Sequence, residues 1–285
     1  MLFKFTNENI NIITTNYTSL LAETIKKYIQ FYYPNINCMI RKTISDTLIN
    51  NVKNNLELII FIGTIHVINS RFINLIPHKK YYVIQIEQLN QTLYYYHKID
   101  DTICKFLKNS KDTFDYSFVN FKYYPCSIKN KIRYMNIYRI YNLIYFSKLP
   151  ICNSLSIDTS KSIDILFIGT LNTRREKILD YLKNNFDINI VIVSNVFGSK
   201  LINKLHNTKI VINLHYYDNA ILEIFRILDV LSNSKCYIIS EVPDNKQETY
   251  LIKKYCKQVE FINTIDKNLH NISNLTSTIH NIISI

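Results

Sequence analysis

The chain has 285 residues, 47% of them hydrophobic, and a formal net charge of +12 at pH 7. It is long enough for two α/β cores, because domains usually hold about 100 to 200 residues. Its longest apolar stretch, Leu56 to Ile68, is interrupted by Glu57 and His66 and is too short to span a bilayer, so we expect no membrane-spanning helix. Heavy use of Ile, Asn, Lys and Tyr without any Trp is typical of an AT-rich genome.

The positive charge is concentrated in the first half of the chain. Residues 1–160 hold 19 Lys and Arg against 10 Asp and Glu, whereas residues 161–285 hold 15 against 12. Such a field favours nucleotide phosphates, acidic glycans, a peripheral contact with an anionic membrane, or nucleic acid, and charge alone does not choose among them. No block of Lys and Arg and no RNA-binding signature is present, so we do not expect a nucleic-acid partner.

The cysteines and the first residues indicate the compartment. The six cysteines are widely scattered, with no close pair of the metal-ligand or redox type, so we expect reduced thiols and no metal site. The segment MLFKFTNENINII lacks the uninterrupted apolar core of a signal peptide. These features predict a cytoplasmic protein, in the host cell if the chain is viral.

The first half predicts an α/β unit. Short apolar, β-rich runs recur at 9–15, 37–44, 56–63 and 81–88. Helical patterns lie at 19–33 and at about 92–107. Between about 115 and 160 the pattern gives way to Tyr-rich segments and then to the polar stretch 151–162, which we interpret as a linker.

The second half alternates more regularly. Nearly continuous apolar runs, typical of strands covered by helices on both faces, occur at 163–169, 188–196, 209–217, 236–241 and 259–263. Segments with helical spacing separate these runs, and residues 264–285 are predicted to be helical. The alternation predicts a parallel, doubly wound sheet. The whole chain is therefore predicted to form two Rossmann-like α/β domains, residues 1–155 and 156–285.

Two of the three glycines mark strand ends. Gly63 and Gly169 each lie in the tetrapeptide Phe-Ile-Gly-Thr after an apolar run. In an open α/β sheet, ligands bind outside the carboxyl ends of the strands. The repeat fits two similar halves, although four residues are too few to establish a duplication.

The loop after Gly169 has the features of a phosphate site. A glycine there lets a phosphate approach the backbone, the following helix N-terminus supplies free N–H groups, and Arg174 and Arg175 can add bidentate contacts. Thr173 and Glu176 have the spacing of a capping box for this helix. The alternative is a tight turn with solvated arginines. The remaining loop residues predicted to contact a ligand are Thr170 and Asn172.

A second group of polar residues lies after the run 209–217. Asp218 or Asn219 can cap a helix that carries Glu223 in its early turns and Arg226 one turn later. The carboxylate of Glu223 can accept both hydroxyls of a ribose, and His215 can point toward the phosphates or the transferred sugar. The alternative is an intrahelical ion pair of Glu223 and Arg226, worth only about 0.3 to 0.5 kcal/mol.

These segments carry a family resemblance. The stretches IDILFIGTLNTRREKIL and VINLHYYDNAILEIFRILDVLSNSKCYIISE resemble the donor-binding domain of group 1 glycosyltransferases of the GT-B fold. In the first half, YYVIQIEQLN and the later FDYS resemble the acceptor-side segment of small transferases of this type from bacteria and large DNA viruses. The resemblance implies two domains facing a cleft and transfer of a sugar from a nucleotide diphosphate donor, without an obligatory metal or other cofactor.

The resemblance also assigns roles to residues. Glu223 matches the glutamate that binds the donor ribose, and Gly169 with Arg174 or Arg175 matches the loop facing the diphosphate. The chain departs from the family eight positions before Glu223, where His215 replaces a glutamate found in retaining members. The glycine-rich loop of the family is replaced by Tyr216, Tyr217, Asp218 and Asn219, of which Tyr216 and Asn219 are predicted to contact the donor.

The candidates on the acceptor side are His66 and Glu87, which lie near the ends of predicted strands. An inverting transferase needs a general base near the acceptor hydroxyl, and either side chain can serve at hydrogen-bond distance. A lone histidine beside an apolar strand is more often a packing residue. Glu87 is flanked by apolar neighbours, where a charge normally has a partner or a function.

The sequence thus predicts a metal-independent glycosyltransferase that uses a nucleotide-sugar donor and a glycan, protein or lipid acceptor. A nucleotide-sugar epimerase of the same fold uses the same cleft and is the alternative enzyme. A binding module that keeps the fold without catalysis is the alternative from another class. His215 in place of the family acid fits that last alternative.

Overall fold

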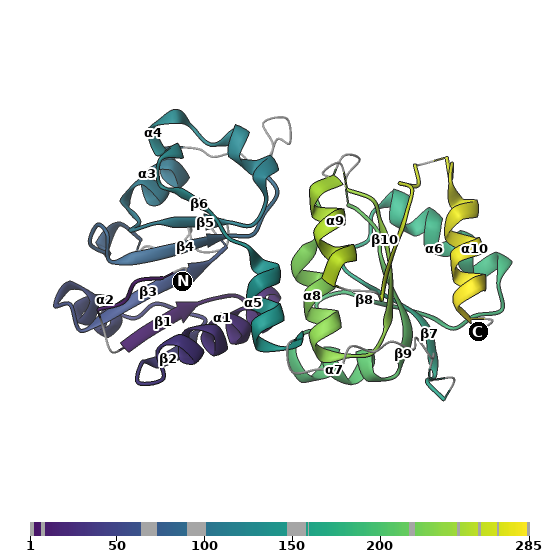
Figure 1. Ribbon diagram of the computed structural model, residues 1–285, viewed down its shortest axis with the longest axis horizontal. Helices are drawn as coiled ribbons and strands as arrows, with labels where there is room; N and C mark the ends of the chain where they lie inside the picture. Colours follow the sequence, from purple (N-terminus) through teal and green to yellow (C-terminus); the bar gives the residue numbers. More distant parts are fainter. Residues whose placement is uncertain are drawn as a thin grey trace. The chain divides into compact units, whose positions relative to one another are not determined.

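The computed structural model of the protein describes residues 3–6, 9–63, 73–89, 101–146, 158, 160–216, 220–243, 246–255, 258–266 and 268–283. It divides into two compact units, residues 1–144 and 145–285, and each unit is described by itself (Figure 1). The predicted boundary between residues 155 and 156 lies outside the described residues.

The first unit is built on a parallel sheet of six strands in the order β2-β1-β3-β4-β5-β6 (Figure 1). Its strands are β1 (Asn9–Ile13), β2 (Asn37–Arg41), β3 (Glu57–Ile62), β4 (Tyr81–Gln85), β5 (Thr113–Asp115) and β6 (Ile132–Tyr134). Its helices are α1 (Ser19–Tyr32), α2 (Asp46–Lys53), α3 (Asp101–Asn109), α4 (Cys126–Lys129) and α5 (Ile137–Ile144), with short 3-10 turns at Asn16–Thr18, Ile73–Leu75 and Phe118–Tyr123.

Helices cover both faces of this sheet. On one face, buried side chains of α2, α3 and α4 pack on Ile59 and Phe61 of β3. Ile60 and Ile62 point to the opposite face, because side chains alternate along a strand, and they are also buried. On that side α1 and α5 pack together (Figure 1). Burial on both faces explains the continuous apolar runs of the sequence.

The second unit is built on a parallel sheet of five strands in the order β11-β10-β9-β7-β8. Its strands are β7 (Ile163–Ile168), β8 (Ile190–Val193), β9 (Thr208–Asn213), β10 (Tyr237–Glu241) and β11 (Val259–Ile262). Its helices are α6 (Thr173–Asn185), α7 (Gly198–His206), α8 (Ile224–Asn233), α9 (Lys246–Tyr255) and α10 (Ile272–Ile283). Side chains of α6 and α10 pack on Ile165, Phe167 and Ile212 in one buried core.

The two sheets have the same topology. Within each unit the second strand is at one edge, followed by the first, the third and the later strands in turn. The chain therefore reverses direction of winding between β1 and β3 in the first unit and between β7 and β9 in the second. Ligands of doubly wound sheets bind at this switch point, outside the carboxyl ends of the strands. The prediction of two Rossmann-like α/β units is confirmed.

Some predicted elements were wrong in extent. The segment 115–160, where the sequence pattern blurs, contains β6, α4 and α5, and β5 ends at its start. The last helix begins at Ile272 and not near Thr264, because Leu269 and Asn271 have left-handed backbone conformations, with φ of 65° and 66°. The helix predicted at 92–107 is described only from Asp101 and continues to Asn109.

Candidate ligand site at the carboxyl edge of the second sheet

Gly169 follows β7 at the switch point and lies in close contact with two arginines. Its φ of +146° is a conformation that side-chain-bearing residues rarely adopt. A Cβ atom built on Gly169 would lie 3.4 Å from Nη2 of Arg226 and 3.5 Å from Nη1 of Arg175. The backbone conformation therefore favours glycine at this position, and the two arginines lie at van der Waals distance from it.

The loop after Gly169 ends at the N-terminus of α6, which Asn172 caps. The Oδ1 atom of Asn172 accepts a hydrogen bond from the backbone N–H of Arg175 at 2.9 Å. Its Nδ2 atom donates to the carbonyl of Tyr216 at 2.8 Å, which joins the loops after β7 and β9. The predicted capping box was therefore wrong by one residue, because Asn172 and not Thr173 occupies the cap.

Arg175 is buried, with 1% of its surface exposed. Its guanidinium donates to the carbonyl of Leu214 at 2.5 Å and to that of Thr170 at 2.7 Å. The same group lies over the ring of Tyr216, 5.0 Å from its centroid. Burial lowers the pKa of Arg175, and the charge of Glu223 opposes this shift. Arg175 is thus a fixed cation that holds both loops and is not the solvated arginine of the alternative interpretation.

Glu223 is held between two arginines. Its Oε1 accepts from Nη2 of Arg175 at 3.2 Å, and its Oε2 accepts from Nη1 of Arg226 at 2.5 Å. Burial alone would raise the pKa of Glu223, but Arg226 and Arg175 together lower it below its ordinary value. The carboxylate of Glu223 is therefore ionised. Because 26% of its side chain remains exposed, a ligand can reach it.

Arg226 belongs to the same group. Its side chain is 22% exposed, and Nη1 donates to Oδ1 of Asn213 at 2.8 Å as well as to Glu223. The side-chain amide of Asn213 in turn donates to Ser240 Oγ at 2.9 Å. Arg226 is therefore supported from the ends of β9 and β10, and the pair with Glu223 is more than an isolated surface ion pair.

The helix carrying these residues begins later than predicted. It starts at Ile224, so Glu223 is the residue before the first turn and does not lie within the helix. The preceding residues Ala220 to Leu222 are buried outside any helix, and the N–H of Leu222 donates to Oε2 of Glu248 at 3.3 Å. This packing keeps them from forming the predicted first turns. Asn219, a predicted cap and donor contact, lies outside the described residues.

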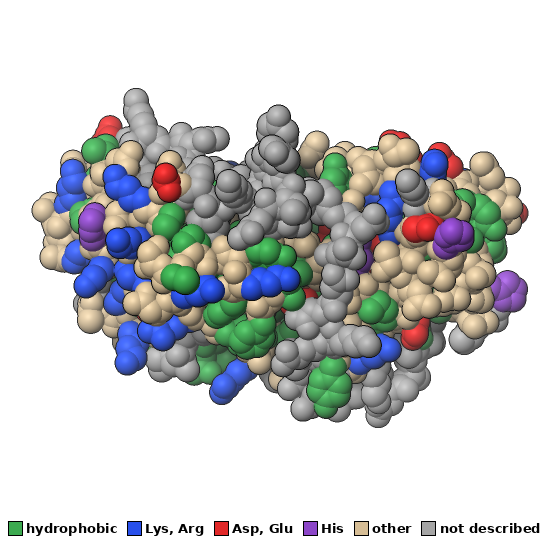
Figure 2. All heavy atoms as spheres, turned by 90° about the horizontal axis from the view of Figure 1, so that it is seen from above, with side chains coloured by type: hydrophobic (Ala, Val, Ile, Leu, Met, Phe, Trp, Pro, Cys, Tyr) green, Lys and Arg blue, Asp and Glu red, His purple; other side chains and the backbone are tan. Residues whose placement is uncertain are grey.

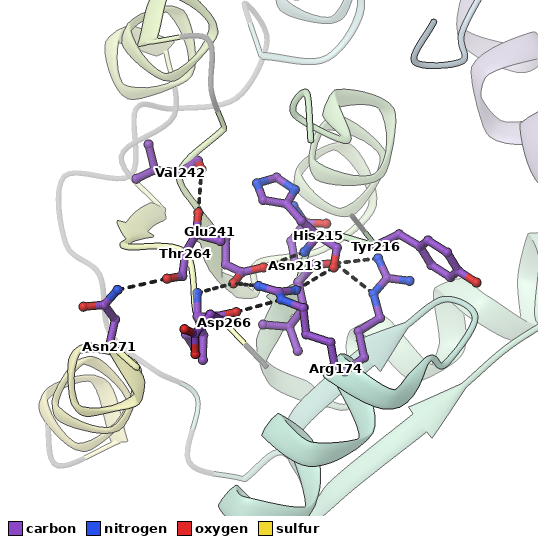
Figure 3. A network of polar contacts seen from close by, with 12 residues as sticks. Arg174, Asn213, His215, Tyr216, Glu241, Val242, Thr264, Asp266 and Asn271 are labelled. Atoms are coloured by element: carbon purple, nitrogen blue, oxygen red, sulfur yellow. Dashed lines mark hydrogen bonds and ion pairs between the residues drawn. The ribbon is translucent and has the colours of Figure 1, made fainter. Parts of the chain in front are cut away.

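Arg174 forms a separate buried network (Figure 3). It is 8% exposed and pairs with Oε1 of Glu241, which is fully buried at the end of β10. Its Nε donates to the carbonyl of Ile265 at 2.7 Å, and its Nη1 donates to the carbonyl of His215 at 2.7 Å. Oε1 and Oε2 of Glu241 also accept from the N–H groups of Ile265 and His215. Arg174 and Glu241 therefore tie together the ends of three elements.

His215 joins this network only through its main chain. Its imidazole points away from Arg174 in Figure 3 and is 1% exposed. Neither Nδ1 nor Nε2 has a hydrogen-bond partner among the described residues. Burial lowers the pKa of His215, against the opposing charges of Glu223 and Glu241, so the ring is neutral. A neutral buried ring with two unused polar atoms costs stability, which is a common property of functional sites.

The predicted residues of the first unit are less fully described. His66 lies outside the described residues. Glu87 follows β4, and its carbonyl accepts a hydrogen bond from Nδ2 of Asn120 at 2.9 Å. The same amide bonds to Asp115, which is fully buried and also accepts from the hydroxyl of Tyr124 at 2.6 Å. The structure thus brings Glu87 close to the segment FDYS through Asn120.

The structure brings together most of the predicted donor residues. Around the switch point of the second sheet, hydrogen bonds, close approach or ring contact join Gly169, Thr170, Asn172, Arg175, Tyr216, Glu223 and Arg226. Sequence reasoning missed Glu241 and Asn213, which support Arg174 and Arg226. Glu241 was signalled by its position at the end of the run 236–241, where parallel strands place side chains at one edge. Asn213 lies in the middle of the run 209–217, and only the structure shows that β9 ends there.

Comparisons with known proteins leave the family open. No protein-family model matches the chain. The uncharacterized protein L140 of Acanthamoeba polyphaga mimivirus is 29% identical over 127 residues, which make up 43% of this chain and 41% of that protein. The match therefore spans about two fifths of that relative's length. Within the described residues, every helix is too short or too polar to cross a membrane.

Solved structures align with the chain at low similarity. The UDP-GlcNAc 2-epimerase of Neisseria meningitidis, bound to UDP-GlcNAc, is 11% identical, with 96% of this chain and 92% of that chain covered and a TM-score of 0.40. The trehalose repressor of Escherichia coli is 11% identical, with 95% and 93% covered and a TM-score of 0.30. The assignment of two parallel α/β units therefore rests on the strand order of the chain itself, and membership of the glycosyltransferases stays a prediction.

Proposed function

We propose that the protein binds a nucleotide-diphosphate sugar at the carboxyl edge of the second sheet and transfers the sugar to an acceptor hydroxyl. The observation that carries the proposal is the position of Glu223. This carboxylate is held by Arg175 and Arg226 beside Gly169, at the switch point of a doubly wound sheet. A fixed, ionised and partly exposed carboxylate is suited to accept the two hydroxyls of a ribose.

The surrounding groups suit a diphosphate. Gly169 adds no side chain beside the guanidinium groups of Arg175 and Arg226, and the N-terminus of α6 supplies N–H groups and partial positive charge in the same loop. Arg226 retains exposed surface, so its guanidinium can reach a phosphate. Arg175 is buried and engaged by the protein, so we assign it as a positioning residue for Glu223. Arg174 is assigned the same kind of role for the loop of His215.

The proposed chemistry needs charge stabilisation and orientation. As the bond between the sugar and the diphosphate breaks, negative charge develops on the leaving phosphate, and fixed cations and helix dipoles stabilise it without reorganising. None of the described residues forms a hydrogen bond with the ring nitrogens of His215. In the proposed mechanism, these nitrogens form hydrogen bonds with the sugar or the phosphate. The acceptor, a glycan, protein or lipid hydroxyl, needs a general base, for which His66 and Glu87 stay the candidates. No metal or other cofactor is included in the proposal.

The first test is nucleotide binding by Glu223→Gln. Calorimetry and thermal shift against UDP, GDP, CDP and their sugar conjugates would identify a nucleotide that stabilises the wild-type protein. We expect Glu223→Gln to weaken that nucleotide about tenfold or more, since loss of a charged hydrogen bond costs about 1.5 to 3 kcal/mol. Glu260→Gln, at an exposed glutamate near the start of β11 and so at the other edge of the sheet, is the matched control and should bind as the wild type does. Wild-type affinity in Glu223→Gln would contradict the donor site.

Product analysis separates the proposed transfer from its alternatives. Release of nucleoside diphosphate together with a glycosylated acceptor supports transfer. Conversion of the nucleotide sugar into an isomer in the absence of any acceptor would instead identify an epimerase. Binding of the nucleotide without turnover across acceptor classes would identify a binding module that has lost catalysis.

A further inference from the structure

The lysines of the first unit are concentrated at one edge of its sheet. Parallel strands all begin at the same edge, and in the first unit a lysine-rich segment leads into the start of nearly every strand. We call this the basic edge. It comprises Lys4, Lys53, Lys79, Lys80, Lys108, Lys111, Lys129 and Lys131.

Hydrogen bonds hold several of these lysines close to one another. The amine of Lys131 donates to the carbonyls of Lys108 and Ser110, and the N–H of Lys79 donates to the carbonyl of Asn109 at 2.7 Å. The amine of Lys111 donates to the carbonyl of Lys4 at 3.1 Å. Burial and the charges of Lys79 and Lys108 lower the pKa of Lys131, against the opposing charge of Asp112. These like charges therefore lie close enough to repel one another.

Among the residues that the structure describes, acidic side chains do little to neutralise this edge. Asp112 lies there and pairs with Arg133 at 3.3 Å. Glu57 begins β3 and accepts hydrogen bonds from Asn11 and Asn51. Over the first unit in Figure 2, blue Lys and Arg side chains predominate and few red ones lie among them. The basic edge thus presents a net positive surface to the solvent.

Large apolar side chains are exposed at the same edge. Leu56, between the end of α2 and the start of β3, is 58% exposed. Phe31 is 55% exposed near the end of α1, and this helix runs back to the edge where β2 begins. Leu56 follows Asn55, whose side-chain oxygen accepts a hydrogen bond from Lys80. Exposed apolar groups and lysines therefore lie at the same edge.

We propose that the basic edge docks on the surface of a membrane that contains anionic lipids. Lysine amines attract anionic headgroups as diffuse point charges, and exposed leucine and phenylalanine side chains can enter the interface beneath them. Nucleic acid fits less well, because arginine is the residue suited to bidentate phosphate contacts. In the part of this edge that the structure describes, the arginine is Arg133, which is paired with Asp112. The combination of lysines with exposed apolar side chains is therefore better suited to an anionic lipid surface.

The docking surface is separate from the proposed donor site. The basic edge is formed by strand starts of the first unit, whereas Glu223 and Gly169 lie at strand ends of the second unit. Membrane binding and nucleotide binding should therefore be independent. Failure of one proposal would leave the other standing.

Co-sedimentation with vesicles tests the docking surface. We expect the wild-type protein to bind vesicles of phosphatidylcholine mixed with phosphatidylglycerol and to bind pure phosphatidylcholine vesicles much more weakly. A variant in which Lys53, Lys79, Lys108 and Lys129 are changed to Gln should lose about tenfold or more in affinity, because lysines near the surface supply the attraction. These four side chains are exposed, so their replacement should preserve the fold.

A second quadruple variant provides the matched control. Lys177, Lys183, Lys200 and Lys235 are exposed lysines of the second unit, and changing them to Gln alters the net charge equally. This variant should bind the mixed vesicles with an affinity within about twofold of the wild-type value. Leu56→Ser should weaken vesicle binding, but less than the quadruple variant of the basic edge does. Equal loss in both quadruple variants, no preference of the wild-type protein for phosphatidylglycerol, or tighter binding to a duplex oligonucleotide than to these vesicles would overturn the proposal.

Discussion

The carboxyl edges of the two sheets follow the same strand order but carry different polar groups. In the second unit, Arg175, Glu223 and Arg226 form a charged cluster that is still partly exposed. In the first unit, the hydroxyls of Thr14 and Thr18 bond to each other at 2.6 Å after β1. The buried carboxylate of that edge, Asp115, is closed off by hydrogen bonds from the protein.

The difference shows how one topology supports two kinds of edge. The strand order determines where a ligand can bind, and the side chains determine what binds there. Among the described residues, the first switch point has no counterpart of the Arg175, Glu223 and Arg226 cluster; beside β1 the exposed Lys42 donates to Oδ1 of Asn16. The Asp115 network of the first unit acts chiefly to hold its own loops together. Three substitutions test this comparison.

The largest expected effect is that of Arg174→Met in the second unit. Removing this guanidinium leaves Glu241 buried without its cation, which typically costs about 3 to 5 kcal/mol. We expect the loops after β9 and β11 to lose protection, because Arg174 also holds the carbonyls of His215 and Ile265. Hydrogen–deuterium exchange resolved by mass spectrometry measures the second unit separately from the first.

Arg133→Met in the first unit is the matched control for this prediction. Arg133 pairs with Asp112, but its side chain is 61% exposed. An exposed pair contributes about 0 to 1 kcal/mol, so exchange in the first unit should change little. If both variants lost similar protection from exchange, the Arg174 network would not stabilise the carboxyl edge of the second sheet more than an exposed ion pair does.

Much of the fold could be predicted because its strands are covered on both faces. Runs such as 163–169 and 209–217 are mostly apolar, and each covers all or nearly all of an observed strand. β5 and β6 have three residues each, which is too short for a recognisable pattern. The start of α8 was also missed, because the apolar residues 220–222 fit a helical pattern although they pack without forming a helix.

The candidate site could be predicted in part for a similar reason. Gly169, Arg175 and Glu223 lie near the ends of apolar runs, and parallel strands bring such ends together. Which arginine binds which carboxylate could not be predicted, since Arg174 and Glu241 are 67 positions apart. The adjacent Arg174 and Arg175 serve two different networks, a distinction that depends on side-chain direction along α6 and not on sequence spacing.

A smaller effect is expected for Tyr124→Phe in the first unit. The hydroxyl of Tyr124 donates to Asp115 at 2.6 Å, and a hydrogen bond to a charged group contributes about 1.5 to 3 kcal/mol. The ring fills the same space after substitution, so the loss measures the hydrogen bond. Urea denaturation and exchange in the first unit should show the loss, while nucleotide binding at the second unit stays unchanged. Altered nucleotide affinity would contradict the structural role of the Asp115 network.

The smallest expected effect on stability, and the one of opposite sign, is that of His215→Leu. The native ring buries two polar atoms without partners among the described residues, so an apolar side chain of similar size should stabilise the second unit by about 1 kcal/mol. The pH dependence should change as well. Burial lowers the pKa of His215 below its ordinary 6.5, so the unfolded chain takes up a proton more readily than the folded one. The contribution of the neutral ring is complete above about pH 6.5 and is lost as the pH falls below it.

In His215→Leu this loss of stability should disappear below about pH 6.5. The pKa of Glu223 is lower in the folded protein than its ordinary 4.5, so Glu223 adds a loss of the same sign only at more acidic pH. Denaturation curves across this range measure the slope, with His206→Leu, at an exposed histidine of α7, as the control. A variant that is more stable and loses sugar transfer would show that His215 is kept for the ligand and not for the fold. If the variant were instead less stable and fully active, His215 would be a packing residue. Its two ring nitrogens would then no longer be evidence of a ligand site at the carboxyl edge of the second sheet.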